Sequence, residues 1–562
     1  MSATPLARLA ELGEQLQATT KRTEMAELLA AFLRELEPEE VPPAVRMTIG
    51  QVFPEWDERA LKVSWKAVKA VVDDLHDASP AEEEAAGRQV VDGGEYIYLL
   101  LSEHRRQPPS PPPLALLEVY QTFEEIAATS GRGSVARKEA LLRKLFRRAS
   151  AVEAKYLAKI IYQEMRHGAS EGIMLDGIAR AAGVKGRLAR RANQLWGDLG
   201  EVASVALTQG KAGLEQASLR LFRPLKPMLA QTAGNMAEAF DQLDGRLALE
   251  YKLDGARVQI HRRGDEVRIY SRNLADVTGS LPDVADAVAA GMAAREAIVE
   301  GEAVAVDAQG RPLPFQHLMR RFRRKHAIAA TLEEVPVQLY LFDALYVNSR
   351  SLVDAPYEAR WAALAEAAGT LTLVPRLLPA TPGEGAAFAE TAHRDGHEGV
   401  MAKALGSAYN PGVRGKAWLK LKHVLSLDLA IVAAEWGYGR RHGWLSNYHL
   451  AALDTARGEF RVVGKTFKGL TDAQFEEMTQ QLLALERGRK GNVVLVRPQV
   501  VVEVLFNEIQ SSRQYPSGLA LRFARISRIR DDKSAAEADT VQTLQQLYEE
   551  QFRYKGQLPG DA

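Results

Sequence analysis

The chain has 562 residues, no cysteine, and 72 basic side chains against 72 acidic ones. This length divides into roughly three or four domains, and a content of 46% apolar and 26% charged residues is typical of folded globular domains. The absence of cysteine excludes disulfides, cysteine nucleophiles and four-cysteine zinc modules, while the balanced charge neither favours nor excludes a nucleic-acid partner.

The first residues, MSATPLARLAELGEQL, lack the charged start and apolar run of a secretory signal. No window of the sequence reaches about 18 consecutive apolar residues, the length that a membrane helix needs. We therefore expect a cytoplasmic protein without a membrane segment, and we expect it to be a monomer.

Residues 1–215 are predicted to form an all-α domain. Ala, Leu, Glu and Arg recur there at helical spacing, and β-branched runs are few. The segment SAVEAKYLAKIIYQEM is typical, because Ser150 and Glu153 form a capping-box pattern ahead of an apolar stripe. The proline-rich QPPSPPP of residues 107–113 cannot continue a helix, so we expect a loop between two helical groups.

Residues 216–423 are predicted to form an α+β domain and residues 424–562 a small β-barrel. After FRPLKPMLAQ, residues 222–231, the pattern changes to short alternating strands separated by Gly and Asp turns. From Leu427 onward, four or five strand patterns and one helical pattern fit a barrel of the oligonucleotide-binding (OB) type. The sequence therefore predicts a multidomain chain of three parts.

The stretch EYKLDGARV, residues 250–258, combines a strand pattern, a lysine and an Asp-Gly turn. Alternation along the strand places Glu250 and Lys252 on one face. Asp-Gly predicts a hairpin, and the same alternation in the second strand adds Arg257 to this polar surface. A solvated surface hairpin would show the same pattern, so the stretch alone does not decide its role.

Seven short motifs occur in a fixed order that resembles the covalent nucleotidyltransferase superfamily of DNA ligases, RNA ligases and mRNA-capping enzymes. They are KLDGAR (252–257), SRN (271–273), VEGEAVAVD (299–307), LYLFDALYVN (339–348), EGVMAK (398–403), WLKLK (418–422) and RFARISRIRDDK (522–533). Each motif is short, but chance rarely produces all seven in this order. The resemblance implies an α+β nucleotidyltransferase (adenylation) domain followed by an OB-fold β-barrel.

The resemblance also implies that Lys252 attacks the α-phosphorus of a nucleotide and carries the nucleotide covalently. Lysine has an ordinary pKa of about 10.4 and attacks only as the neutral amine. We expect surrounding cations to lower the Lys252 pKa. The implied nucleotide-binding residues are Glu250, Arg257, Arg272, Glu302, Phe342, Lys403, Lys420, Lys422, Arg528, Arg530 and Lys533, and the implied Mg²⁺ ligands are Glu302 and Glu398.

Within this set, Glu250 and Phe342 are expected at the base, while Lys420 and Lys422 share one strand face toward the phosphates. Arg528, Arg530 and Lys533 lie on the barrel, so their role requires the barrel to close over the nucleotide. Glu302 is the implied ligand of either a metal ion or the ribose. Asp254 is either a plain turn residue or a helper in later steps, and Glu300 stays without an assigned role.

The predicted helical domain indicates whether the nucleotide is passed to DNA or to RNA. YLAKIIYQEMRHGASEGIMLDGIARA, residues 156–181, resembles the DNA-binding domain of cellular and archaeal ATP-dependent DNA ligases, which capping enzymes and most RNA ligases lack. NAD-dependent DNA ligases carry a four-cysteine zinc module, and this chain has no cysteine. The predicted DNA contacts are Arg166 and Gly168 in a helix connection, Arg320 and Arg321 in RPLPFQHLMRRFRRKH, and Arg440 and Arg441 in GYGRRHG.

The sequence thus predicts an ATP-dependent DNA ligase that seals 5′-phosphate/3′-hydroxyl nicks in duplex DNA through lysyl-AMP and DNA-adenylate, with ATP and Mg²⁺. An RNA ligase or a capping-type guanylyltransferase remains an alternative. A catalytically inactive nucleic-acid-binding scaffold is another. The sequence leaves open a sliding-clamp or repair partner, and a role in replication, repair or recombination.

Overall fold

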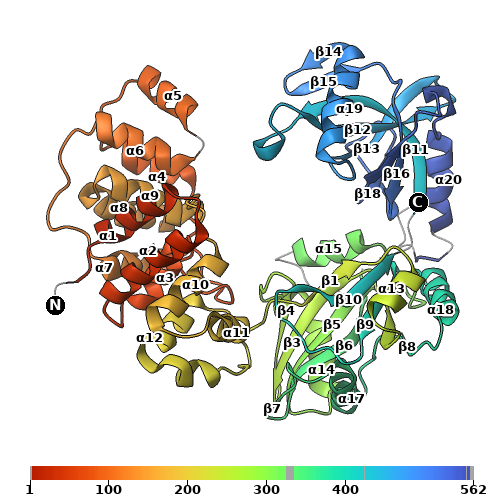
Figure 1. Ribbon diagram of the computed structural model, residues 1–562, viewed down its shortest axis with the longest axis horizontal. Coiled ribbons are helices and arrows are strands. Elements are labelled where there is room, and N and C mark those ends of the chain that lie inside the picture. The colour runs from red at the N-terminus through yellow and green to blue at the C-terminus, as the bar shows by residue number, and fades with distance from the viewer. Residues whose placement is uncertain (1–2, 91, 324–334, 423–424, 552–553, 557–562) are drawn as a thin grey trace.

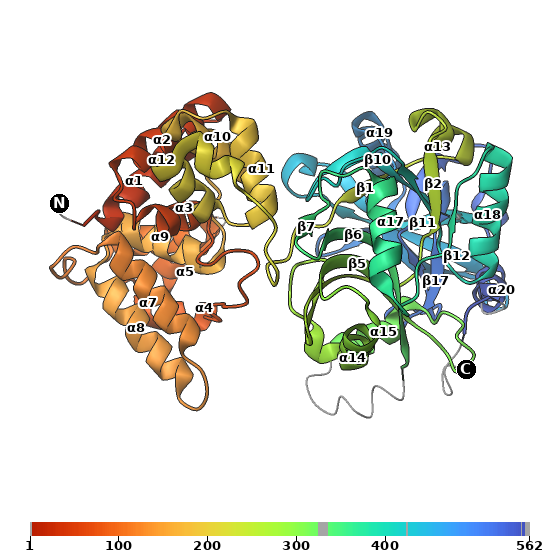
Figure 2. The same ribbon diagram turned by 90° about the horizontal axis from the view of Figure 1, so that it is seen from below.

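A computed structural model describes residues 3–90, 92–323, 335–422, 425–551 and 554–556. Figure 1 shows a helical N-terminal part, coloured red to yellow, on one side, and two strand-containing parts, green and blue, on the other. Seen from below, the helical part again lies beside the central part (Figure 2). The predicted fold class is confirmed: a helical part, an α+β part and a strand-rich part follow one another along the chain.

The N-terminal part is built from helices, most of which contribute apolar residues to one core. They are α1 (Leu6–Gln17), α2 (Arg22–Glu35), α3 (Val41–Thr48), α4 (Trp65–Asp73), α5 (Pro80–Gln89), α6 (Gly93–Glu103), α7 (Leu116–Ala128), α8 (Ser134–Arg148), α9 (Ala151–Tyr162), α10 (Glu171–Ala182), α11 (Gly186–Trp196) and α12 (Leu199–Glu215). The capping box of Ser150 and Glu153 at the start of α9 is confirmed. The proline-rich loop lies between α6 and α7, as predicted.

The central part contains two five-stranded sheets, ordered β1-β10-β9-β2-β8 and β4-β3-β5-β6-β7 in the described residues. Its elements are β1 (Leu229–Thr232), α13 (Met236–Gln242), β2 (Leu247–Tyr251), β3 (Ala256–Arg263), β4 (Glu266–Ser271), η1 (Thr278–Ser280), α14 (Pro282–Gly291), β5 (Glu296–Ala305), α15 (Phe315–Arg323), β6 (Val337–Val347), β7 (Arg350–Ser351), α17 (Tyr357–Ala368), β8 (Arg376–Leu377), α18 (Pro382–Arg394), β9 (Gly399–Ala404) and β10 (Arg414–Lys422). Helix α17 packs against β6, which places it on the second sheet.

The predicted hairpin at Asp254 and Gly255 is wrong. β2 pairs with β8 and β9, whereas β3 pairs with β4 and β5, so the two strands belong to different sheets. A Cβ atom on Gly255 would lie 2.3 Å from the carbonyl oxygen of Ala303, and only glycine allows β5 to approach this closely. The KLDGAR motif therefore crosses from one sheet to the other.

The C-terminal part contains more strands than the sequence predicted. Its described elements are β11 (Leu425–Trp436), η2 (Gly439–Arg441), β12 (Leu445–Asp454), β13 (Glu459–Thr466), α19 (Asp472–Ala484), β14 (Glu486–Lys490), β15 (Val493–Val496), β16 (Val501–Phe506), β17 (Glu508–Ser511), β18 (Leu519–Arg522), β19 (Arg525–Ile529), η3 (Ala535–Glu537) and α20 (Val541–Gln551). β11 pairs with β12, β15 and β16, and this long strand joins the sheet around the apolar core of the barrel.

No helix in the described part of the chain is both long enough and apolar enough to span a membrane. The boundaries between the three parts, at residues 215/216 and 423/424, remain our proposal, and the second of them falls on residues outside the described ranges. The helical part ends with α12, and the segment between α12 and β1 leads into the central part.

Candidate active site

Lys252 follows β2 and lies against the start of β9. Its backbone N–H donates to the carbonyl of Gly399 at 2.9 Å, and its carbonyl accepts from the Glu398 N–H at 3.0 Å. The Lys252 Nζ is 2.8 Å from Glu398 Oε2, and the Lys422 Nζ is 2.5 Å from the same oxygen. One carboxylate therefore bridges two amines that are far apart in the sequence.

The charge state of Lys252 differs from our expectation. Burial lowers the Lys252 pKa, but the carboxylates of Glu398, Glu302 and Asp254 outweigh burial, and the pKa is raised above its ordinary value. Burial raises the pKa of Glu398, yet Lys252 and Lys422 outweigh it and bring this pKa to about 2. The expected lowering of the Lys252 pKa is thus wrong for this arrangement. A neutral Lys252 requires that Glu398 be drawn away from it.

Lys420 and Lys422 lie on one face of β10, as the alternation predicted. The intervening Leu419 and Leu421 are buried, while both lysines are partly exposed. Burial, and next the charge of Lys422, lowers the Lys420 pKa. The two amines form a positive strand face that adjoins Lys252 through Glu398, an arrangement suited to phosphate oxygens.

Arg257 and Glu302 face each other across β3 and β5, where they are paired in register. The Arg257 Nη2 is 2.7 Å from Glu300 Oε2, and its guanidinium carbon lies 5.4 Å from the ring centre of Phe342. Burial raises the Glu302 pKa to about 7, against the opposing charge of Lys252. The second sheet thus contributes one cation, two carboxylates and an aromatic ring to the site. Arg272 is exposed directly after β4.

Glu250 and Lys403 form a buried ion pair of 2.6 Å, with only 2% and 1% of these residues exposed. The Lys403 Nζ is enclosed by three aromatic rings, at 4.7, 4.9 and 4.4 Å from Phe342, Tyr357 and Trp418. The hydroxyl of Tyr357 donates to the other oxygen of Glu250. In this arrangement Lys403 holds Glu250, and direct binding of a nucleotide by Lys403 stays a prediction.

Asp254 is buried and contacts the C-terminal part. Its carboxylate is 2.8 Å from the Lys555 Nζ and 3.7 Å from the Arg522 Nη1. Lys555 also lies 2.8 Å from Glu508 in β17. Asp254 is therefore more than a turn residue, since it joins the central and C-terminal parts. The sequence analysis missed Lys555 because it follows the last motif and belongs to no recognisable pattern.

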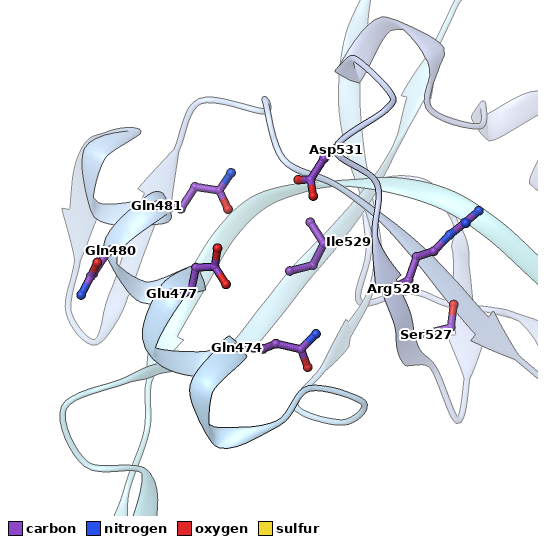
Figure 3. A pocket seen from close by; sticks show the side chains of 8 residues that line it. All are labelled: Gln474, Glu477, Gln480, Gln481, Ser527, Arg528, Ile529 and Asp531. Carbon is purple, nitrogen blue, oxygen red and sulfur yellow. The ribbon is translucent and has the colours of Figure 1, made fainter.

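The cations of the last motif lie elsewhere. Arg530 and Lys533 bind one oxygen of Asp428, at 2.7 and 2.6 Å. Arg528 lies 3.5 Å from Glu503, and it lines a groove of about 570 Å³ between α19 and β19 (Figure 3). All of these partners belong to the C-terminal part. The structure does not bring these three cations together with Lys252.

The residues predicted to contact DNA differ in their exposure. Arg166 and Gly168 are exposed in the connection between α9 and α10, and both have positive φ, 53° and 80°. Arg320 is exposed on α15, but Arg321 is 3% exposed and pairs with Asp283 at 2.6 Å. Adjacent positions of a helix point about 100° apart, so Arg321 is covered where Arg320 is exposed, and its contact with DNA stays a prediction. Residues 324–326 of this basic run lie outside the described residues.

The loop that carries Arg440 and Arg441 lies between β11 and β12. Arg440 is exposed and binds the carboxylate of Asp472 at the start of α19. Arg441 donates to the carbonyl of Phe467 at 2.8 Å, and its guanidinium covers the ring of Phe475 at 4.4 Å. Arg440 remains accessible to a phosphate, whereas Arg441 mainly holds the loop.

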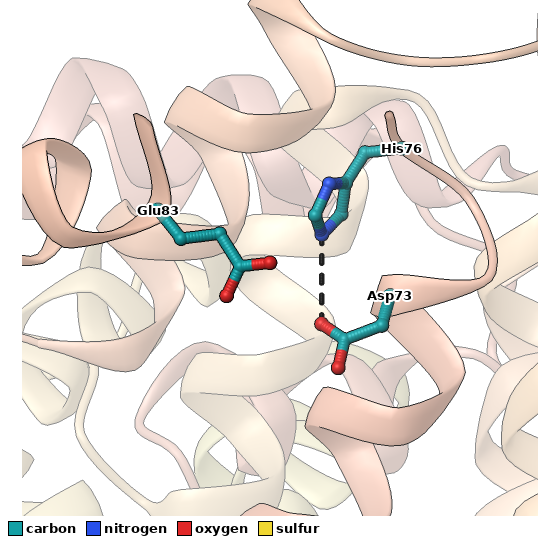
Figure 4. A group of neighbouring side chains, drawn as sticks. All are labelled: Asp73, His76 and Glu83. Carbon is teal, nitrogen blue, oxygen red and sulfur yellow. Dashed lines mark ion pairs between the residues drawn. The ribbon is translucent and has the colours of Figure 1, made fainter. Parts of the chain in front are cut away.

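A second group of acidic and histidine side chains lies in the helical part, where Asp73, His76 and Glu83 approach one another (Figure 4). The Lys69 Nζ is 2.7 Å from Asp73 and 2.8 Å from Glu83, so an ammonium already neutralises both carboxylates. The His76 Nδ1 accepts from the Ala78 N–H, which leaves the proton on Nε2, the atom that a metal ion would need. We assign the group to the packing of α4 against α5.

Comparisons with known proteins identify the family. The family models "DNA ligase N terminus", "ATP dependent DNA ligase domain" and "ATP dependent DNA ligase C terminal region" match residues 5–179, 227–422 and 441–533. DNA ligase 1 of Korarchaeum cryptofilum is 47% identical over 98% of this chain and 99% of its own. This chain belongs to the ATP-dependent DNA ligase family.

Other relatives of the ligase agree with this assignment. The DNA ligase of Thermococcus onnurineus is 43% identical over 97% of this chain and 98% of its own length. A probable DNA ligase of Anaeromyxobacter sp. (strain K) is 44% identical over 97% of this chain and 99% of its own. The solved structure "Pmar-Lig_Pre." is 17% identical with a TM-score of 0.54, over 93% of this chain and 99% of that one, and it supports the fold. These findings favour a DNA ligase over the RNA-ligase, capping-enzyme and inactive-scaffold alternatives.

Proposed function

We propose that this ATP-dependent DNA ligase seals nicks in duplex DNA and that Lys252 carries the AMP. The observation that carries the proposal is the bridge from Glu398 to Lys252 and Lys422, which puts a lysine at the start of a cationic strand face. Such a face stabilises the negative charge that builds on phosphate oxygens when a nucleophile attacks phosphorus. A surface lysine without a role in catalysis would not need these surroundings.

In the first step the neutral Lys252 Nζ attacks the α-phosphorus of ATP. A nitrogen–phosphorus bond forms, the bond to the bridging oxygen breaks, and pyrophosphate leaves. Lys420 and Lys422 stabilise the phosphate charge, Arg257 and Arg272 bind the sugar or the phosphates, and Phe342 stacks on the base. Glu250, held by Lys403 and Tyr357, accepts from the base amino group. In the later steps AMP passes to the 5′-phosphate at a nick, and the 3′-hydroxyl displaces it.

The residues beside Lys252 fit a Mg²⁺ ion. Glu302 and Glu398 offer carboxylate oxygens, the ligand type that Mg²⁺ prefers, and the Glu398 carboxylate has low affinity for protons because its pKa is about 2. These two residues would hold the ion. When bound, Mg²⁺ would supply positive charge for the phosphate oxygens. A Glu398 carboxylate that holds a cation would stabilise the charged form of Lys252 less.

The acceptor is proposed to be nicked duplex DNA, held by the helical part (residues 1–215) and the OB part (residues 424–562) around the adenylation part (residues 216–423). Arg166, Gly168, Arg320 and Arg440 are accessible on these parts and are proposed as phosphate contacts. Arg528, Arg530 and Lys533 would have to leave their acidic partners and approach the pyrophosphate as the OB part moves. The cytoplasmic location and the monomeric state remain predictions of the sequence.

Incubation with ATP labelled at the α-phosphate tests the proposal. We expect label on the wild-type protein and on Lys416→Ala, which changes an exposed lysine of the same strand β10. Lys252→Ala should carry no label, because the variant lacks the proposed attacking amine. Label on Lys252→Ala would show that another residue is the nucleophile. Addition of nicked DNA, and of nicked RNA in parallel, then identifies the acceptor.

A further inference from the structure

The segment that links the helical and adenylation parts runs along one face of β3. Three alternate side chains of that strand hold it, as period-two geometry allows. The His261 Nδ1 accepts from the Phe222 N–H at 2.8 Å, the Gln259 Oε1 accepts from the Leu225 N–H at 2.8 Å, and the Arg257 Nη1 donates to the Met228 carbonyl at 2.7 Å. Arg257 therefore belongs to the linker contact as well as to the candidate nucleotide site.

Tyr409 completes this junction. It is fully buried in the connection between β9 and β10. Its hydroxyl oxygen accepts from the Met228 N–H at 2.9 Å and lies 3.3 Å from the Arg257 Nη2, which is also bound to Glu300. Burial, and next the negative charge of Glu300, holds the Tyr409 pKa well above its usual value, so the hydroxyl keeps its proton. Met228 and Tyr409 also belong to the apolar cluster that begins in the helical part.

These contacts leave one nitrogen of Arg257 unused. Both terminal nitrogens are engaged, whereas Nε is buried and has no hydrogen-bond partner among the residues that the structure describes. The guanidinium is planar, so fixing its two terminal nitrogens also fixes the direction of the Nε–H. A buried donor without a partner is unfavourable, and an oxygen of a bound nucleotide would satisfy it.

We propose that Tyr409 is a positioning residue for ATP. By holding Arg257 and the Met228 peptide together, its hydroxyl aims the unused Nε–H at the nucleotide and connects the nucleotide site to the linker of the DNA-binding part. The inference rests on the proposed function, since it takes Arg257 to face ATP. It adds a residue that lies outside the sequence motifs and that acts through Arg257.

The test is the formation of enzyme–AMP by full-length Tyr409→Phe at varied ATP concentration. The matched control is Tyr448→Phe, which removes the hydroxyl of a fully buried tyrosine with no hydrogen-bond partner in the described part of the chain. We expect Tyr409→Phe to raise the KM for ATP about fivefold, the effect of roughly one hydrogen bond, with the maximal rate within about twofold of wild type. A KM equal to that of Tyr448→Phe overturns the proposal.

A double-mutant comparison separates positioning from general packing. If Tyr409 acts through Arg257, Tyr409→Phe should change the KM for ATP by less than about twofold in an Arg257→Lys background. An undiminished effect in that background overturns the proposal. Thermal melting of all variants monitors folding, and Glu300→Gln, which weakens the other contact of the Arg257 Nη2, should raise the KM in the same direction even if Tyr409→Phe folds poorly.

The same assay distinguishes this inference from the proposed function. No label on the wild-type protein overturns both. Normal labelling of the wild type together with an unchanged KM in Tyr409→Phe overturns only the role of Tyr409.

Discussion

Two groups of cations in this ligase bind carboxylates in different parts of the chain. Lys420 and Lys422 project from one strand of the adenylation part, and strand pairing places them beside Lys252 without any movement of domains. Arg530 and Lys533 instead bind Asp428 within the OB part. Strand pairing alone therefore positions Lys420 and Lys422 at the candidate site. Arg530 and Lys533 are bound to Asp428 within the OB part and need a domain movement to act.

Glu398→Ala removes the acidic partner of Lys422 and should have the largest effect on enzyme–AMP formation. The carboxylate bridges Lys252 and Lys422 and is the proposed metal ligand. Its loss would favour the neutral amine of Lys252, but we expect the loss of the metal ligand to outweigh this gain. We expect enzyme–AMP formation to fall on the order of 10³-fold, measured as single-turnover labelling. Glu390→Ala, an exposed glutamate of α18, is the control. A rate within tenfold of that control would remove Glu398 from the chemistry.

Arg530→Ala removes one of the two cations that bind Asp428. Since the arginine would act only after the OB part has moved over ATP, we expect labelling to fall about 10²-fold. Sealing of a nick that already carries AMP should be unchanged, because no pyrophosphate leaves in that step. Arg513→Ala, an exposed arginine of the same part, is the control. Equal losses in both assays would mean that Arg530 acts on DNA or on folding instead.

His261 contrasts with both groups, because it holds the linker as a neutral ring. Burial lowers its pKa to about 3, while the unfolded chain protonates near the ordinary value, about 6.5. As the pH falls from 6.5 to 5, only the unfolded state gains this proton, so the free energy of unfolding decreases by up to about 2 kcal/mol. Between pH 7 and pH 5, we expect the melting temperature of His261→Gln to fall less than that of the wild-type protein. His442→Gln, at an exposed histidine, should behave as wild type.

Lys555→Ala concerns the contact between the two regions and should have the smallest effect. Removal of the amine leaves Asp254 and Glu508 facing each other without their shared cation, which weakens the contact between the OB and adenylation parts. If this contact opposes the movement of Arg530, labelling should become about two- to fivefold faster. Lys490→Ala, at an exposed lysine of β14, is the control. Slower labelling would instead assign the contact to the active arrangement.

Local patterns predicted much of the fold and part of the site. The capping box at Ser150 and the shared face of Lys420 and Lys422 are confirmed, because both depend on residues within a few positions of one another. The Asp-Gly hairpin was wrong, because the close approach of Ala303 to Gly255 sends the chain into a second sheet. The burial of Arg321 was not predicted, because a basic run shows charge but not which side of the helix is covered.

The sequence by itself determined the family resemblance, the order of the three parts and the identity of Lys252 as the proposed nucleophile, since these depend on residue types in a fixed order. Only the tertiary structure decided that Glu398 is the partner of Lys252, that Lys403 is enclosed with Glu250, and that Asp254 meets Lys555. The physical reason is that ion pairs, burial and pKa depend on neighbours within a few ångströms, and folding draws those neighbours from distant parts of the chain.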